Sequence, residues 1–139
     1  SLIFGQVFLR IPLRKSPNIV QGDALELDWE SLLPPAKCGY IIGNPPFIGH
    51  QNRNTKQKAG MHAVWGVSGQ VNRLDYVSGW FKKAADFAKN NRTIGIAFVS
   101  TNSIVMGEQA GILWPALYKI GSNSQAPPRL SSFDYHSRR

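Results

Sequence analysis

Residues 40–47 read YIIGNPPF, a short apolar run followed by two consecutive prolines. A run of this kind, rich in β-branched and aromatic residues, predicts a buried parallel strand. Each proline fixes its own φ at about −65° and restricts the preceding residue to extended geometry. The backbone through Asn44 and Pro45 is therefore rigid, and it aims the Asn44 side-chain oxygen and the Pro45 carbonyl in fixed directions.

These two acceptors indicate a site for a planar amino group. Both oxygens can converge on one amine, while Phe47 offers a flat face to the ring that bears it. An amine conjugated with a ring is a poor nucleophile, and two acceptors stabilise the positive charge that develops as it attacks. The segment therefore predicts chemistry at such a nitrogen.

Other apolar runs near this segment indicate an open α/β fold. NIVQ at residues 18–21 and TIGIAFVS at residues 93–100 are predicted strands. Between YIIG and TIGIAFVS, residues 72–90 show apolar positions at helical spacing, with Asn72 as the expected N-cap. A strand, a helix and a second strand form a βαβ unit, whose crossover is expected to be right-handed.

A second helix is predicted around GEQAGILW, residues 107–114, with Pro115 ending or kinking it. After it, residues 119–139 are rich in Ser, Pro, Asn and Arg and lack any period, so we predict an irregular or non-native tail. The expected domain is therefore residues 1–118.

Polar residues follow each predicted strand. They are Asp23, Asn44, and Thr101 with Asn102. In open α/β sheets ligands bind outside the carboxyl ends of the strands. We therefore expect a pocket at this edge.

Composition and charge indicate a soluble domain with affinity for a polyanion. The 139 residues are 42% apolar, and 16 Lys and Arg outnumber 8 Asp and Glu, giving a net charge of +8. No apolar run is long enough for a membrane span. The single Cys38 and the lack of a Cys and His cluster predict no disulfide and no metal site, as is usual in the cytoplasm.

A basic stretch follows the double proline directly. Residues 50–58 contain Arg53, Lys56 and Lys58 and no acidic residue. Because neutralised phosphates release counterions, we predict that these three side chains bind nucleic acid.

The segment GNPPF resembles the catalytic motif of amino-group DNA methyltransferases, which use S-adenosylmethionine and mostly modify adenine. Successive blocks look like the methyltransferase region of bifunctional restriction-modification enzymes: LRIPLRKSPNIVQGDALELDW, YIIGNPPFIGHQ, LDYVSGWFKKAADF and IAFVSTNSIVMGEQAGILWP. The resemblance covers about residues 7–118. It implies a partial class I S-adenosylmethionine-dependent methyltransferase fold, with a mostly parallel sheet and flanking helices.

The resemblance also implies roles for individual residues. It assigns the catalytic motif to Asn44, Pro45, Pro46 and Phe47. Phe47 would stack on an adenine flipped out of double-stranded DNA, which is required because the amine is inaccessible inside the stack. Asp23 and Ala24 would bind S-adenosylmethionine.

The sequence departs from this family in its cofactor site and in its tail. The family's acidic residue after the second strand is absent, and residues 119–139 do not look like the family's further strands or target-recognition region. No glycine-rich turn precedes Asp23, although the family binds its cofactor there. We therefore expect a partial domain that belongs to a larger methyltransferase polypeptide and is inactive in isolation.

Two other functions fit parts of the pattern. A protein glutamine amide is also planar, and enzymes that methylate it use a similar motif, usually ending in tyrosine. Alternatively, the positive charge alone would suit a non-catalytic DNA-binding fragment.

Overall fold

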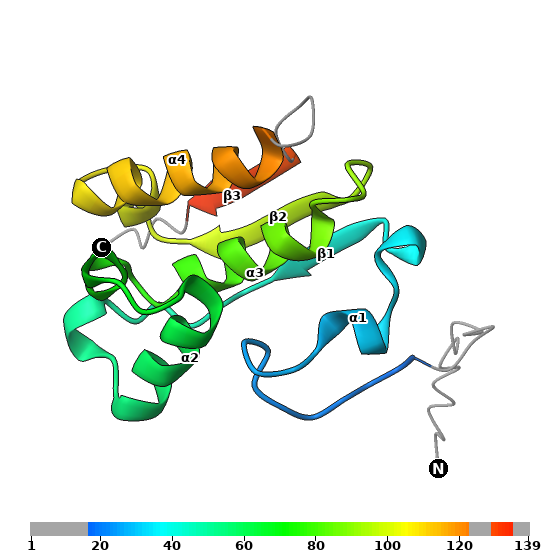
Figure 1. The fold of residues 1–139 in the computed structure, drawn as a ribbon, viewed down its shortest axis with the longest axis horizontal. Coiled ribbons are helices and arrows are strands. Elements are labelled where there is room, and N and C mark those ends of the chain that lie inside the picture. The colour runs from blue at the N-terminus through cyan, green and yellow to red at the C-terminus, as the bar shows by residue number, and fades with distance from the viewer. Residues whose placement is uncertain (1–16, 123–128, 135–139) are drawn as a thin grey trace, which may run out of the picture.

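The structure, a computed structural model, describes residues 17–122 and 129–134 of the chain. This part contains a parallel sheet of three strands in the order β1-β2-β3 (Figure 1). The strands are β1 (Tyr40–Gly43), β2 (Gly95–Ser100) and β3 (Arg129–Asp134). Gly43 pairs with Phe98 and Ser100 with Asp134, so the carboxyl ends of the three strands lie together at one end of the sheet.

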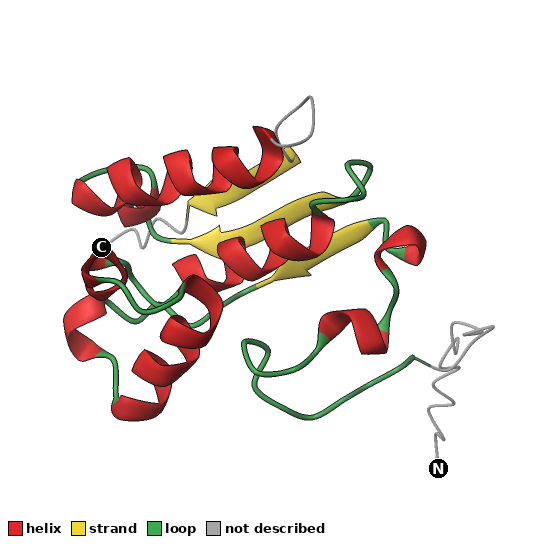
Figure 2. Ribbon diagram, in the orientation of Figure 1, coloured by secondary structure: helices red, strands yellow, loops and turns green. Residues whose placement is uncertain are grey.

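Helices precede, connect and follow the first two strands. The α-helices are α1 (Trp29–Leu32), α2 (Thr55–Trp65), α3 (Ser78–Ala88) and α4 (Glu108–Ser122). Short 3-10 helices are η1 (Pro35–Lys37), η2 (His50–Asn52), η3 (Gly69–Arg73) and η4 (Asn102–Ile104). In Figure 2, α3 and α4 lie on the same face of the sheet. The predicted α/β class, with a mostly parallel sheet and flanking helices, is confirmed.

The core lies between this face and the two helices. Ile96 and Phe98 of β2 are buried, and the Phe98 ring meets the ring of Phe81 on α3 edge-on at 5.1 Å between centroids. Phe81 also contacts Trp114 of α4, with centroids 6.1 Å apart. One aromatic side chain therefore joins the sheet to both helices. The connection from β1 to β2 crosses this face in a right-handed sense (Figure 1).

The strand at YIIG forms as predicted, but it is not buried. β1 lies at the edge of the sheet among the described strands, and Tyr40 and Ile42 are 81% and 78% exposed. The prediction of a strand at residues 18–21 is wrong. That segment has no regular structure, and Ile19 is exposed. Among the described strands β1 pairs with β2, and none pairs with residues 18–21.

The helix predicted over residues 72–90 begins later, at Ser78, so Asn72 is not its N-cap. Distant partners use the backbone donors just before it. The Asp75 N–H donates to Oε1 of Gln109 at 2.9 Å, and the Tyr76 N–H donates to the carbonyl of Ile48 at 2.8 Å. These contacts keep the chain in an extended turn where helical spacing alone predicted a helix.

α4 continues through Pro115 to Ser122, so the proline does not end the helix. Leu113 and Leu117, on either side of it, are both fully buried and bind the two halves to the core. The irregular structure predicted for residues 119–139 is also wrong where the chain is described, since residues 119–122 are helical and residues 129–134 form β3. The boundary between a domain of residues 1–118 and a separate tail stays a prediction.

None of the helices in the described part combines the length and the apolar character that a membrane span requires.

Candidate active site

The loop that follows β1 exposes the Asn44 side chain and the Phe47 ring. Gly43 ends the strand against the core, where a Cβ would lie 3.3 Å from the Phe98 ring. Asn44 is exposed, Pro45 is buried, and the Phe47 side chain is 43% exposed. The buried proline fixes the loop to the body of the protein, while the amide and the aromatic ring remain accessible.

The two predicted acceptors are both available. Within the described residues, neither the Asn44 side chain nor the Pro45 carbonyl accepts a hydrogen bond from another group. The next carbonyl, of Pro46, accepts from the Ile48 N–H at 3.1 Å and closes a tight turn around Phe47. The loop thus offers two unengaged oxygens beside an exposed ring.

A cavity of about 920 Å³ lies next to this loop. Asn44, Pro45 and Pro46 line it, together with Asp23 and Ala24 of the segment before α1. Lys56 lines it as well, so six of the predicted site residues share one cavity. Phe47, Thr101 and Asn102 are not among the residues that line it.

Local hydrogen bonds shape the turn that contains Asp23. Its carboxylate Oδ1 accepts from the Leu25 N–H at 3.0 Å, and its carbonyl accepts from the N–H groups of Glu26 and Leu27. The carbonyl of Ala24 accepts from the Trp29 indole at 2.8 Å. In the described part of the chain, Asp23 Oδ2 has no hydrogen-bond partner and is free for a ligand.

Lys83 of α3 anchors this turn to the core. Its ammonium donates to the carbonyls of Leu25 and Leu27 at 2.6 and 2.5 Å. Burial lowers the pKa of Lys83, and the negative charges of Asp28 and then Asp23 oppose that shift. The lysine therefore holds the Asp23 turn against α3 through backbone contacts.

The cavity has the size and the mixed apolar and polar lining of a small-molecule site. Its volume falls within the ~300–1,000 Å³ of small-molecule sites. Trp29, Tyr40 and Ile42 supply apolar surface, and Asp23 and Asn44 supply acceptors. These residues match the chemistry of S-adenosylmethionine, which has an apolar purine face and an amino group to be accepted.

The predicted basic stretch divides into three different environments. Arg53 is only 4% exposed, and it donates to the carbonyls of His50, Val71 and Asn72 at 3.2 Å. Burial lowers its pKa, while Asp75 opposes the shift, and an arginine stays charged regardless. Its predicted contact with DNA does not fit this buried position, because three backbone oxygens already use the guanidinium.

The two lysines of the stretch lie on α2 and are exposed. Lys56 also lines the cavity and pairs with Glu26 at 3.6 Å, whereas Lys58 has no ion pair in the described part. We did not predict α2 itself. Its sequence signal is a capping box, in which the Asn54 side chain accepts from the Gln57 N–H and the Gln57 side chain accepts from the Asn54 N–H, both at 2.9 Å.

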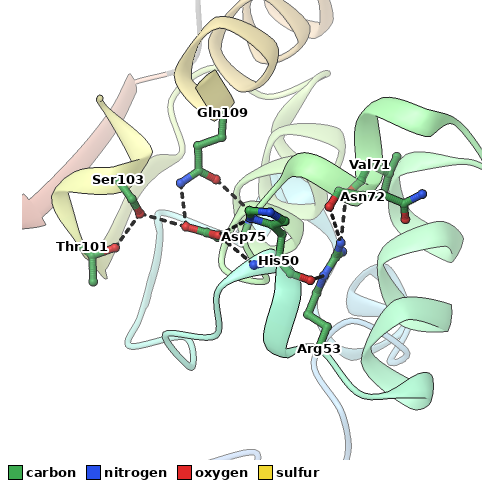
Figure 3. Close-up of polar contacts among 8 residues, drawn as sticks. All are labelled: His50, Arg53, Val71, Asn72, Asp75, Thr101, Ser103 and Gln109. Carbon is green, nitrogen blue, oxygen red and sulfur yellow. Dashed lines mark hydrogen bonds and ion pairs between the residues drawn. The ribbon is translucent and has the colours of Figure 1, made fainter. Parts of the chain in front are cut away.

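Sequence reasoning also missed a polar cluster behind the loop, drawn in Figure 3. Asp75 lies at its centre, between His50, Ser103 and Gln109. Thr101, predicted as a ligand-facing residue, shares a 2.7 Å hydrogen bond with Ser103 at the margin of this cluster. A lone aspartate in a predicted helix gave no signal of such contacts, since its partners are 25 to 34 residues away in sequence.

The chain belongs to the family described as MmeI, DNA-methyltransferase domain, which it matches over residues 3–134. The resemblance that the sequence indicated is thereby confirmed.

Two known proteins make the relation more specific. The chain is 35% identical over 113 residues to DNA methyltransferase A of Bacillus subtilis (strain 168), a match that covers 80% of this chain and 13% of that protein. A solved structure of the Type IIL restriction-modification enzyme MmeI in complex with DNA superposes with a TM-score of 0.74 and 45% identity. That match covers 85% of this chain and 16% of the MmeI chain. The chain therefore spans about a sixth or less of the proteins that it matches.

Proposed function

We propose that this domain transfers a methyl group from S-adenosylmethionine to the exocyclic amino group of adenine in double-stranded DNA. The observation that carries this proposal is the pair of unengaged acceptors, Asn44 Oδ1 and the Pro45 carbonyl, at the carboxyl end of β1. They adjoin a cavity that also contains Asp23. Family membership and the DNA in the related MmeI structure support the choice of DNA as the substrate.

The loop residues act on the amine. Asn44 and Pro45 accept its two hydrogens, which favours a more tetrahedral nitrogen and stabilises the positive charge that develops on it. The nitrogen needs no dedicated base, because methylation makes it acidic enough to release a proton to water or to these acceptors. The two residues therefore position and activate the nucleophile in one contact.

Phe47 holds the base that bears the amine. An amino group inside a duplex is blocked by its neighbours, so the adenine must leave the stack. The Phe47 ring is exposed next to the acceptors and offers the extruded base a replacement for the lost stacking.

The cavity residues hold the cofactor. Asp23 and Ala24 would contact its adenosine half, and Asp23 Oδ2 is the free acceptor there. When bound, S-adenosylmethionine supplies an electrophilic methyl group. The Asp23 turn and the Asn44 loop line one cavity, so that methyl donor and amine would meet in it.

Two further partners are proposed, the phosphates of the DNA and the rest of a larger polypeptide. Lys56 and Lys58 on the exposed side of α2 would contact phosphates near the loop. We further propose that the domain works as part of a larger cytoplasmic polypeptide, which supplies the other cofactor and DNA contacts.

A substrate comparison tests the proposal. Full-length enzyme with radiolabelled S-adenosylmethionine is given either duplex DNA or a glutamine-bearing protein. We expect label in the DNA and none in the protein. Label in the protein alone would replace adenine with an amide as the substrate, and label in neither would leave a binding function.

A further inference from the structure

Asp75 is an acceptor for three separate parts of the chain (Figure 3). It lies between η3 and α3, and its side chain is 19% exposed. Oδ1 accepts from the His50 N–H at 3.0 Å, while Oδ2 accepts from Ser103 Oγ at 2.9 Å and from Gln109 Nε2 at 2.7 Å. The Asp75 N–H completes the cluster by donating to Gln109 Oε1.

The contact with His50 reaches the candidate active-site loop. His50 lies three residues after Phe47, and the intervening Ile48 carbonyl accepts from the Tyr76 N–H. Arg53 donates to the carbonyl of His50. Both backbone groups of His50 are thus fixed, and Asp75 with its neighbour Tyr76 supplies two of the contacts that fix the chain just after Phe47.

The other contacts attach Asp75 to the body of the fold. Ser103 lies in η4, directly after β2, and Gln109 is in the first turn of α4 and is buried. The position of the loop after β1 is therefore set against the ends of the adjacent strand and helix. In the described part, Asp75 and Arg53 are the two residues whose side chains hydrogen-bond to the backbone of residues 48–50.

We propose that Asp75 is a positioning residue, which aligns Phe47 and the two acceptors with the target amine through the backbone of residues 48–50. This inference rests on the proposed function, and it adds a residue outside the double-proline loop to it.

The chemistry of the cluster requires a carboxylate. An ionised carboxylate only accepts hydrogen bonds and can serve three donors on two oxygens, whereas an amide must present a donor on one side. In Asp75→Asn, the NH₂ group faces either the His50 N–H or the Gln109 NH₂, and one of these contacts becomes repulsive. The substitution keeps the size of the side chain, so it tests the contacts with little change in packing.

Single-turnover methyl transfer by the full-length enzyme tests the role. In Asp75→Asn we expect the rate constant at saturating DNA and S-adenosylmethionine to fall by about 10- to 100-fold, the scale of a misplacement near 1 Å. The dissociation constants for both ligands should stay within about threefold, because only the alignment of the amine changes. The amplitude of the first turnover counts the folded enzyme, so misfolding lowers the amplitude without lowering the rate constant.

Two further variants complete the test. Asp86→Asn removes a carboxylate from the surface of α3, where Asp86 pairs with Lys82, and it should leave the rate constant unchanged. Ser103→Ala removes one of the three donors and should lower the rate constant by about three- to tenfold. It replaces Asp75→Asn as the test if that variant does not fold.

Rate constants for Asp75→Asn and Ser103→Ala equal to that of Asp86→Asn would overturn the positioning role, as would a loss confined to amplitude. Absence of DNA methylation by the wild-type enzyme would instead refute the proposed function.

Discussion

At the scale of single residues, the double proline explains much of the site. Pro45 is buried and Asn44 is exposed, so the proline ring fixes the rigid turn in the protein while the Asn44 amide remains accessible. The residue types from Asn44 to Phe47 are sufficient to predict this arrangement, because each proline limits the backbone locally. The accessibility of Phe47 depends on the turn closed by Pro46 and Ile48, which is also local.

Removing the ring of Phe47 should weaken catalysis without unfolding the protein, since the side chain is partly exposed. We expect Phe47→Ala to lower kcat/KM for DNA by roughly 10- to 100-fold, which corresponds to the ~1–3 kcal/mol of a base stacked on an aromatic ring. Phe47→Tyr keeps the ring and should retain most activity. Steady-state kinetics on both variants checks this, and equal kinetics for Phe47→Ala and wild type would refute the stacking role.

At the scale of elements, sequence patterns located β1, β2, α3 and α4 but misplaced the limits of the two helices. α3 begins six residues after Asn72 because Asp75 and Tyr76 bond to Gln109 and Ile48 instead of continuing a helix. Such partners are distant in sequence, so local spacing could not reveal them. The capping box that begins α2 is local and could have been recognised.

The buried Arg53 joins η2 to η3 and should matter for stability. Arg53→Met keeps an apolar stem but removes the guanidinium that donates to the carbonyls of His50, Val71 and Asn72, and a hydrogen bond from a charged group contributes about 1.5–3 kcal/mol. We expect urea denaturation of the full-length enzyme to show a clear loss of stability in the transition that includes this domain. Lys58→Met also removes one positive charge, but from an exposed position, and it should alter that stability by less than about 0.5 kcal/mol. Equal effects of the two substitutions would show that Arg53 does not join these segments.

Lys58 should also affect DNA binding. If Lys58 contacts one phosphate, Lys58→Met should reduce the slope of log affinity against log salt concentration by about one. Binding titrations at several salt concentrations measure that slope. An unchanged slope would remove Lys58 from the DNA interface.

At the scale of the whole molecule, β1 leaves apolar side chains in contact with solvent. Tyr40 and Ile42 are exposed on a strand that has one neighbour among the described residues. Unpaired strand edges and exposed apolar surface both favour association. In the described part of the chain, β1 is therefore less covered than the parallel strands of a typical domain, which are covered on both faces.

We expect the 139-residue chain, produced alone, to self-associate in sedimentation experiments as its concentration rises. Ile42→Lys should reduce the association because it places a charge on the exposed strand. Val67→Lys is the matched control, since Val67 is also exposed but lies in the loop after α2, and it should have no effect. A monomer at all concentrations, or equal effects of the two substitutions, would contradict this prediction.

The most direct test of the central claim is to identify the methylated product. Full-length enzyme is incubated with duplex DNA and S-adenosylmethionine, and the DNA is digested to nucleosides for mass spectrometry. We expect N6-methyladenine with the wild-type enzyme and none with Asn44→Ala, although the variant should bind S-adenosylmethionine with an affinity within a few-fold of wild type. A methyl group on another base, or N6-methyladenine formed by Asn44→Ala at the wild-type rate, would contradict the account.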